Sequence, residues 1–421
     1  MATEPSSRLT ADRLALVYQL SKTFNSSLNL EDVLNSVMDE VISATHAERG
    51  FVVLRADDGQ LEFSAARGVD QATIGQPEFQ ISRGVMEQVA RDGEGVLTSD
   101  AQQDERFMSR QSVMSLGLRS ILCAPLRVKE KVLGAIYVDN RLHAGIFMPA
   151  DLELLIAIAA SAATAIENAR LYQVAVDKGR MERELSMARR VQTGLIPETI
   201  PELAGWEFAA SWLPAREVAG DFYDFIPRDG RDLGLVIADV TDKGMGAALF
   251  MALTRSMVRA SLEGEVSAAE AISKANRLIC ANSTTAMPVT LFYGRVTPSG
   301  GELIYVNAGH NPPLLYRSAS GSFEELGRTG LVLGVDASIT LDQHSTTLEP
   351  GDCLVLYTDG VTDALNAAEQ PFGEQRLRST IEASASGSAQ AIALALLQAL
   401  QEFIGGADPF DDITLLVAKR S

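Results

Sequence analysis

Acidic residues stand at the ends of apolar segments throughout the second half of this 421-residue chain. Asp239 follows the apolar run 233–238, and Asp359 follows the run 353–358 and precedes a glycine. The same kind of placement recurs at three further residues, Asp221, Asp411 and Asp412. A carboxylate at the end of a buried strand is costly to desolvate unless an opposite charge compensates it. The pattern therefore indicates a site at which several carboxylates share such a charge.

Carboxylates gathered in one place raise one another's pKa and resist ionisation, whereas bound cations remove this penalty. The donors are all oxygen atoms, and no cysteine or histidine cluster accompanies them, which favours Mg²⁺ or Mn²⁺ over Zn²⁺. Taken singly, Asp359–Gly360 could be a turn and Asp411–Asp412 a connector into a strand. Because the whole set has matching flanks, we favour a metal centre over these separate structural interpretations.

The elements that must position these residues are predicted from the spacing of apolar side chains between about residues 205 and 421. Strands are predicted at 233–238 and 354–357, where apolar runs are bounded by turn residues. Amphipathic helices are predicted at 245–262, 268–282 and 389–403. Strands and helices that alternate in this way indicate a mixed α and β domain.

Two further segments of this region have interpretable patterns. The runs 303–306 and 313–316 flank the segment Asn307–Pro312, which is rich in turn residues and predicts a β-hairpin. The stretch 379–388 is small and polar, which predicts a mobile loop.

The first 150 residues show helical and strand-like patterns in succession. A helix is predicted from residue 30, because apolar residues recur at helical spacing and Asn29 and Asp32 form a start signal. Strand-like runs follow at 50–54, 61–66, 95–98, 121–128 and 132–138. A predicted helix at 85–91 interrupts them. Helices at both ends with strands between them predict an α+β domain built on an antiparallel sheet.

Residues 151–196 form a nearly continuous helical pattern. Apolar positions alternate at spacings of four and three as far as Val176, and the pattern resumes at Met181 after a step that contains Gly179. Such an offset suits a helix that kinks or pairs in two ways, and so transmits a signal in a dimer. The alternative, a core helix followed by an ordinary linker, stays equally open. Pro197 ends the helix.

Bulk composition narrows the remaining possibilities. The length predicts two domains with a connector, and 46% hydrophobic with 22% charged residues is typical of a soluble globular protein. The net charge of −19 argues against nucleic acid and anionic membranes as partners. The run 152–166 comes nearest to a membrane span, but acidic and small residues interrupt it, so we expect a buried helix. The first residues lack the layout of a signal peptide, and three isolated cysteines indicate a reducing cytoplasm.

Five segments of the second half resemble, in order, the motifs of the SpoIIE-type branch of the type 2C, metal-dependent protein phosphatases. They are Glu217–Phe225, Ala238–Ala252, Asn307–Leu315, Tyr357–Ala364 and Asp411–Leu415. The resemblance covers about residues 180–420. It departs from the family at Ala219, where a second glycine is usual, and at Asp363, where glutamate is common. It implies an αββα sandwich and a serine/threonine phosphatase of the kind that acts in bacterial partner-switching signalling.

The resemblance also implies a set of metal ligands. In this sequence they are Asp221, Asp239, Asp359, Asp411 and the carbonyl oxygen of Val240. Asp239 is expected to bridge two ions, Mn²⁺ or Mg²⁺. Asp412 and Asp224 would bind a metal-held water molecule or orient a ligand, and Asp412 could instead be a further metal ligand. The two ions would lower the pKa of a shared water molecule, and the hydroxide would attack phosphorus in line without a phosphoenzyme intermediate.

Three other residues or segments have two interpretations each. Arg216 could hold the substrate phosphate, since a guanidinium matches phosphate geometry, or could make only a solvated ion pair. His310 could protonate the leaving group or only shape a turn. The segment Lys243–Gly246 could present amides to an anion, although we expect a turn that sets the Asp239 loop.

The first part of the chain resembles a GAF domain, a sensor of small molecules or partners. The resemblance covers about residues 14–172 and lies in the strand Arg49–Leu54 and in the runs Ser120–Leu126 and Val132–Asp139. The signature of the members that bind cyclic nucleotides is absent. Cys123 stands in an apolar strand and is expected to be a packed thiol rather than a chromophore attachment. The ligand of this domain is therefore unknown.

We thus predict an α+β protein with two domains: a GAF-like sensor (1–150) with an antiparallel sheet and flanking helices, a long helical linker (151–196) and a phosphatase domain (197–421). The predicted function is sensor-regulated hydrolysis of phosphoserine or phosphothreonine on a signalling protein similar to an anti-sigma-factor antagonist. A homodimer through the linker is expected, in the cytoplasm. The alternatives are a catalytically silent binding module and a hydrolase of a small phosphoester.

Overall fold

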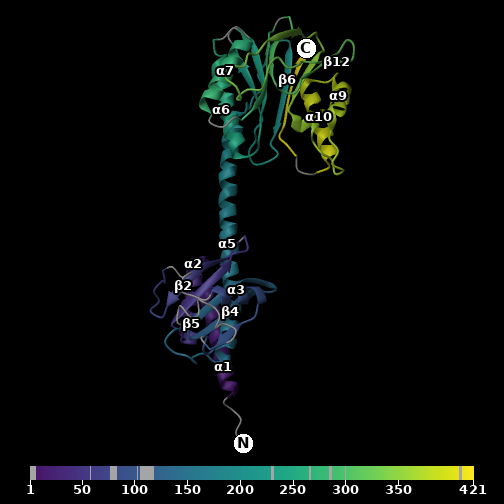
Figure 1. The fold of residues 1–421 in the computed structure, drawn as a ribbon. Helices are drawn as coiled ribbons and strands as arrows, with labels where there is room; N and C mark the ends of the chain where they lie inside the picture. The colour runs from purple at the N-terminus through teal and green to yellow at the C-terminus, as the bar shows by residue number, and fades with distance from the viewer. Residues whose placement is uncertain are drawn as a thin grey trace. The chain divides into compact units, whose positions relative to one another are not determined.

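The computed structural model describes residues 6–56, 58–75, 83–101, 103–104, 118–228, 232–264, 267–283, 287–298, 300–406 and 410–421. The chain divides into two compact units, Met1–Arg180 and Met181–Ser421 (Figure 1). One long helix contributes residues to both units, and each unit is described by itself.

A five-stranded antiparallel sheet, ordered β2-β1-β5-β4-β3, forms the centre of the first unit. Its strands are β1 (Arg49–Arg55), β2 (Leu61–Gly68), β3 (Val96–Thr98), β4 (Ser120–Val128) and β5 (Lys131–Asn140). The helices that accompany them are α1 (Ser6–Phe24), α2 (Leu30–Thr45) and α3 (Arg83–Asp92). The side chain of Asn29 accepts hydrogen bonds from the Glu31 and Asp32 amides, which satisfies free N–H groups of the first turn of α2. The α+β class predicted for this region is confirmed.

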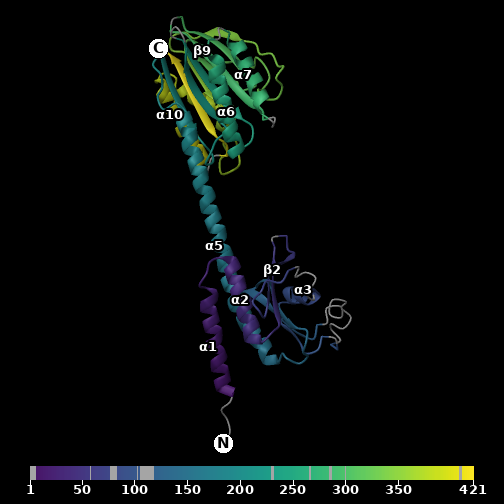
Figure 2. The same ribbon diagram turned by 90° about the vertical axis from the view of Figure 1, so that its left-hand side faces the viewer.

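Helices cover both faces of this sheet (Figure 2). One face packs against α1, α2 and the first part of the long helix α5, with Val37 and Ile158 fully buried. Helix α3 covers the other face through side chains such as Val89. A buried ion pair joins two neighbouring strands, since Arg49 Nη2 on β1 lies 2.6 Å from Asp139 Oδ2 on β5. These two residues are register partners, so the pair stabilises the alignment of the strands.

Helix α5 (Pro149–Leu195) runs without a break through the segment predicted as a linker. One face of its first part, which includes Leu155, Ile158, Ala162 and Ala169, is buried in the core of the first unit, so this part is a core helix. The prediction that no segment is long and apolar enough to cross a bilayer is wrong. Among the described residues α5 alone meets both criteria, although 44% of its most apolar window is buried inside the protein. Acidic residues 151 and 153 do not prevent this, because the small and apolar residues that follow them dominate the window.

The second unit contains two five-stranded antiparallel sheets between two layers of helices (Figure 1). One sheet has the order β13-β10-β9-β8-β7 and the other β12-β11-β14-β15-β6. The strands are β6 (Trp206–Leu213), β7 (Phe222–Pro227), β8 (Leu233–Val240), β9 (Val289–Val296), β10 (Glu302–Ala308), β11 (Leu314–Arg317), β12 (Ser322–Glu325), β13 (His344–Thr347), β14 (Cys353–Tyr357) and β15 (Ile413–Arg420). The helices are α6 (Met245–Leu262), α7 (Ala268–Asn282), α8 (Asp359–Thr362), α9 (Gly373–Ser384) and α10 (Ala389–Ile404). This arrangement is the αββα sandwich that the resemblance implied.

Burial on both faces explains why the central strands were recognisable in the sequence. Helices α6 and α7 pack on the first sheet, and α9 and α10 pack on the second, while the inner faces of the sheets meet. All five residues of β14, and all but one of β8, are therefore buried. A strand of this kind has a continuous apolar run rather than an alternating pattern.

The hairpin predicted across Asn307–Pro312 is wrong, because β10 and β11 belong to different sheets. The intervening segment carries the chain from one sheet to the other through Gly309, whose φ is 72°. Pro312 has no N–H group to continue a ladder. The Asn307 side chain fixes this crossing, since its Oδ1 accepts a hydrogen bond from the His310 amide at 2.8 Å.

The mobile loop predicted at 379–388 is also wrong, since α9 extends as far as Ser384. Leu377 and Ile381 lie four residues apart and are both fully buried. Burial of this apolar face therefore outweighs the weak helix propensity of the small polar residues around it.

Candidate functional site

Antiparallel pairing places the predicted acidic residues at one end of each sheet of the second unit. Asp221 directly precedes β7 and Asp239 lies next to the end of β8, and these two strands are neighbours. In the other sheet, Asp359 lies two residues after the end of β14, and Asp411 stands just before β15, which is the neighbour of β14. Each sheet therefore presents its aspartates at one end of its strands. We call this region, with Asp221, Asp239, Asp359, Asp411 and Asp412, the acidic edge.

Hydrogen bonds and an ion pair across the sandwich show that the two edges meet. Thr414 Oγ1 of β15 donates to Asp221 Oδ2 at 2.8 Å. Lys243 Nζ, in the loop after β8, lies 2.8 Å from Asp411 Oδ2. The structure therefore brings together the five predicted aspartates, Asp221, Asp239, Asp359, Asp411 and Asp412.

Burial and mutual repulsion disfavour the charged forms of these carboxyl groups. Desolvation and then the charge of Asp239 raise the pKa of Asp221 well above its usual value, and this side chain is only 3% exposed. Desolvation and then the charge of Asp359 raise the pKa of Asp239 to about 6. The pKa values of Asp359 and Asp412 are raised as well, first by desolvation and in part by Asp411. Nearby cations would reverse this penalty.

Two glycines let the backbone close around the acidic residues. A Cβ atom at Gly220 would lie 2.8 Å from the carbonyl oxygen of Val240, so the segment that carries Asp221 passes close to this predicted ligand. A Cβ atom at Gly360 would lie 2.0 Å from the carbonyl oxygen of Asp412. The approach of α8 to the start of β15 therefore requires glycine at position 360.

Asp412 holds both ends of the segment 215–220. Its Oδ1 accepts a hydrogen bond from the Ala215 amide at 2.8 Å, and its Oδ2 accepts one from the Gly220 amide at 2.9 Å. Arg216 lies within this segment, and its side chain is exposed. In the described part of the chain no ion pair occupies Arg216, so its guanidinium is available to solvent beside the acidic edge.

Asp224 has a different environment from the other aspartates. Its side chain is 1% exposed, and its Oδ2 lies 3.1 Å from Arg255 Nε and 2.6 Å from Arg259 Nε. Both arginines belong to α6, so Asp224 anchors this helix to β7. The side chain is therefore already engaged, which argues against the interpretation that it orients a ligand.

His310 is buried beneath the surface rather than presented to a substrate. It is 1% exposed, and its Nδ1 lies 2.7 Å from Thr290 Oγ1. Burial lowers its pKa to about 3, so the imidazole is neutral near pH 7 and is a poor proton donor. The structure favours the turn role for His310.

Lys243 takes part in the site through its ammonium group. Its Nζ donates to the Phe410 carbonyl at 2.9 Å and lies 4.5 Å from the centre of the Phe410 ring, in addition to its pair with Asp411. The expected turn at the start of this segment is confirmed, since Asp242 and Gly244 have positive φ angles of 81° and 91°. The sequence did not predict the long-range contact, because nothing local marks it.

The acidic set fits divalent cations by its chemistry. Within the described ranges, no three acidic, histidine or cysteine side chains lie close enough together to form a complete metal cage. Asp221, Asp411 and Asp412 instead direct oxygen atoms towards Thr414, Lys243 and backbone amides. The donors are carboxylates, of which those of Asp221, Asp239 and Asp359 have raised pKa values, and one backbone carbonyl. Such oxygen donors are suited to Mg²⁺ or Mn²⁺. The ligand assignment itself stays a prediction.

Sequence reasoning missed the role of Gln192 in α5. This side chain is 4% exposed and forms hydrogen bonds to Ala219, two residues before Asp221. The available indication was a polar residue at a position where the spacing of α5 called for an apolar one.

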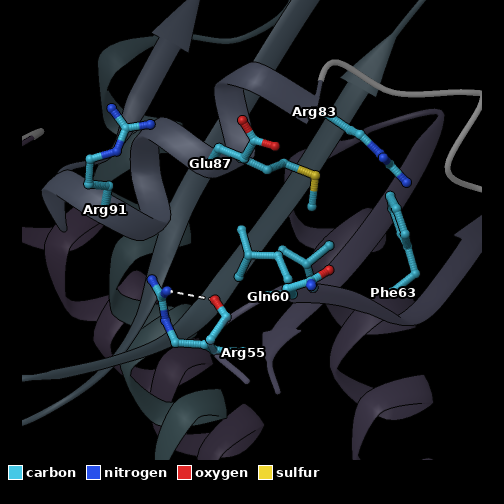
Figure 3. Close-up of a pocket in the computed structure, with 10 residues that line it drawn as sticks. Arg55, Gln60, Phe63, Arg83, Glu87 and Arg91 are labelled. Carbon is cyan, nitrogen blue, oxygen red and sulfur yellow. Dashed lines mark hydrogen bonds between the residues drawn. The ribbon is translucent and has the colours of Figure 1, made fainter. Parts of the chain in front are cut away.

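A separate cavity of about 410 Å³ lies in the first unit, between the β1–β2 hairpin and α3. Figure 3 shows three arginines around it, with Arg55 donating to the Gly59 carbonyl, and with Glu87 between Arg83 and Arg91. The apolar part of its lining is formed by Val53, Leu61, Phe63 and Met86. The cavity thus combines positive charge with an apolar surface.

Comparisons with known sequences match both units. A family model described as stage II sporulation protein E (SpoIIE) matches residues 229–421, and a GAF domain model matches residues 29–166. Protein IcfG of Synechocystis sp. is 34% identical over 273 residues, which are 58% of this chain and 43% of IcfG. Phosphoserine phosphatase RsbU of Bacillus subtilis is 31% identical over 244 residues, which are 57% of this chain and 71% of RsbU. The chain therefore spans less than half of IcfG and more than two thirds of RsbU.

A solved structure supports the fold of the second unit. The SiaA-PP2C domain of Pseudomonas aeruginosa superimposes with a TM-score of 0.52 and 21% identity, and the match covers 59% of this chain and 99% of that domain. At this identity the likeness concerns the fold, and it agrees with the αββα sandwich described above.

Substitution of Gly360 by alanine is expected to destabilise the second unit by about 3 kcal/mol, because the new Cβ atom would clash with the backbone at Asp412. Chemical unfolding of the full chain measures this change. Gly327→Ala is the matched control, since a Cβ atom there would meet nothing within 4 Å. Equal stability of the two variants would contradict the close approach.

Acid is expected to destabilise the protein through His310. Its pKa of about 3 in the folded state is below the value of about 6.5 in the unfolded chain, so the folded state resists protonation. The contribution of His310 to stability is therefore fully present above pH 6.5 and is lost, by about 1.4 kcal/mol per pH unit, as the pH falls towards 3.

The measurement is the free energy of unfolding between pH 6 and pH 4. His310→Gln should reduce the slope of this free energy against pH by the amount that corresponds to the uptake of about one proton on unfolding. His344→Gln, at an exposed position, should leave the slope unchanged. The same slope in both variants would show that His310 is not a buried neutral imidazole.

Proposed function

Since the chain belongs to the SpoIIE-type branch of the PP2C serine/threonine phosphatases and joins it to a GAF domain, we propose that it is a sensor-regulated, metal-dependent protein phosphatase. Its substrates are phosphoserine or phosphothreonine residues on a signalling protein. The observation that carries this proposal is the set of aspartates with raised pKa values at the meeting edges of the two sheets.

In this proposal Asp221, Asp239, Asp359, Asp411 and the Val240 carbonyl hold two divalent cations, Mg²⁺ or Mn²⁺. When bound, such ions shield phosphoryl charge and acidify a water molecule that can attack phosphorus. Asp412 positions the segment 215–220 through its two backbone contacts rather than by binding metal. Arg216, held in that segment with its side chain exposed, binds the substrate phosphate.

The cysteines do not suit an alternative mechanism with a thiolate nucleophile. Cys123 and Cys353 are buried, and burial raises the pKa of the Cys353 thiol to about 12 and that of Cys123 further. The pKa of Cys280 is also raised, first by desolvation. A thiol becomes a nucleophile only as the thiolate, so these residues favour attack by water. The unpaired cysteines also support a reducing cytoplasm as the location.

The substrate is a phosphorylated signalling protein similar to an anti-sigma-factor antagonist. RsbU, of which this chain covers 71%, is named as a phosphoserine phosphatase. Catalytically silent binding and hydrolysis of a small phosphoester are the two competing functions.

The GAF domain receives a small anionic molecule in its cavity. Arg55, Arg83 and Arg91 provide positive charge there, although the whole chain has a net charge of −19. The apolar lining would accept the uncharged part of such a ligand. Its binding acts on the second unit through α5, in a homodimer that pairs the exposed apolar residues of this helix, Leu171, Val174, Val176 and Met181.

Asp239→Asn is expected to reduce Mn²⁺-dependent hydrolysis of p-nitrophenyl phosphate at least about 100-fold, because it removes the carboxylate at the centre of the set. Asp342→Asn, at an exposed position away from the acidic edge, is the matched control. Full activity of the Asp239 variant would contradict the assignment of this residue as a metal ligand. An inactive parent protein would favour the silent module, and a preference for nucleotides over a phosphoserine protein would favour a small substrate.

The full chain is expected to be a dimer, and deletion of residues 1–175 is expected to change both its assembly and its phosphatase activity. Sedimentation velocity and steady-state assays of both forms measure this effect. A truncated monomer with the activity of the full chain would rule out regulation through α5.

A further inference from the structure

The last turn of α5 carries a buried amide among exposed neighbours. Gln192 is 4% exposed, whereas Val191 and Thr193 on either side of it are exposed. A buried side-chain amide is costly unless its donors and acceptor find partners. The partners of Gln192 therefore show what this turn of the helix does.

Both ends of the Gln192 amide bind the backbone of one residue. Its Oε1 accepts a hydrogen bond from the Ala219 amide at 3.1 Å, and its Nε2 donates to the Ala219 carbonyl at 2.9 Å. Nε2 also lies 3.3 Å from the carbonyl oxygen of Ala248. One side chain thus joins α5 to the segment before β7 and to the first turn of α6.

These two segments are the ones that flank the acidic edge. Ala219 lies between the exposed Arg216 and the buried Asp221, and the next amide, that of Gly220, donates to Asp412. Ala248 follows the loop that begins at Asp239. A shift of Gln192 would therefore alter the backbone on both sides of the site at once.

We propose that Gln192 is the positioning residue through which α5 holds the Asp221 segment and the start of α6 at the spacing that metal binding requires. This inference rests on the proposed function, because it assigns a role in assembling that centre. Helix α5 is continuous from Pro149. A shift or rotation of this helix would therefore be transmitted to the acidic edge first through the Gln192 side-chain amide.

A purely structural role would have a different consequence. If Gln192 only satisfied buried backbone groups, its loss would lower the melting temperature but would leave the metal affinity of the folded protein unchanged. Metal affinity and local backbone protection therefore distinguish the two roles.

The test uses the full chain and the substitution Gln192→Leu, which keeps side-chain bulk and removes all three hydrogen bonds. Amide hydrogen exchange at Gly220, whose amide donates to Asp412 and not to Gln192, should become about tenfold faster in the metal-free protein, and Mn²⁺ affinity measured by calorimetry should fall about tenfold. Gln173→Leu is the matched control, because Gln173 is exposed on the same helix and bonds only to Asp177.

Gln192→Glu provides a second variant in case the leucine substitution prevents folding. It keeps the acceptor for the Ala219 amide but turns a carboxylate oxygen towards the carbonyls of Ala219 and Ala248. Its Mn²⁺ affinity should fall at least as far. The proposal is overturned if the parent protein binds Mn²⁺ and a folded Gln192 variant binds it as tightly as the Gln173 control.

Failure of the proposed function is recognised separately. If the parent protein binds no Mn²⁺, the metal assignment fails, and exchange at Gly220 alone decides whether Gln192 positions the segment. If the parent binds Mn²⁺ and the Gln192 variants bind it equally well, only this inference fails.

Discussion

The second unit depends on keeping several carboxyl groups together at one edge, where Asp221 is buried and Asp239, Asp411 and Asp412 are half-buried. Desolvation favours their neutral forms, and neighbouring charges strengthen this effect. The surrounding protein offsets part of the cost with the Thr414 hydroxyl, the Lys243 ammonium and the backbone amides that bind Asp412. The part of the desolvation and repulsion cost that the protein does not offset favours the binding of cations. The acidic edge is therefore costly for the fold alone and favourable for a metal-dependent reaction.

Much of this arrangement could be predicted from the sequence, because the informative patterns are local. Buried strands gave continuous apolar runs that ended at Asp239 and Asp359, and the start of α2 was marked by its Asn29 cap. In an antiparallel sheet, the end of one strand then lies beside the start of its neighbour. The mixed α and β class and a site of shared carboxylates follow from such features, whereas the αββα sandwich and the ligand set were implied by the family resemblance.

What the sequence could not reveal lies in contacts between distant segments. The apolar runs around Asn307 suggest a hairpin in isolation, yet their pairing partners are in different sheets. The stretch after Leu377 has poor helix propensity, and only its burial against the second sheet makes it helical. The contacts of Lys243 with residues near β15, and those of Gln192 with Ala219, depend on the finished fold. Local spacing contains no record of them.

The two hydrogen bonds from the segment 215–220 to Asp412 have a consequence for folding during biosynthesis. The Ala215 amide and the Asp412 carboxylate are 197 residues apart in the chain, and β6 pairs with β15 along its whole length. A nascent chain that emerges from the ribosome without β15 has neither this clamp nor a partner for β6. Contacts of such high sequence separation form slowly, because closing the long loop costs entropy before it yields any contact. The acidic edge therefore acquires this clamp only after β15 has been made.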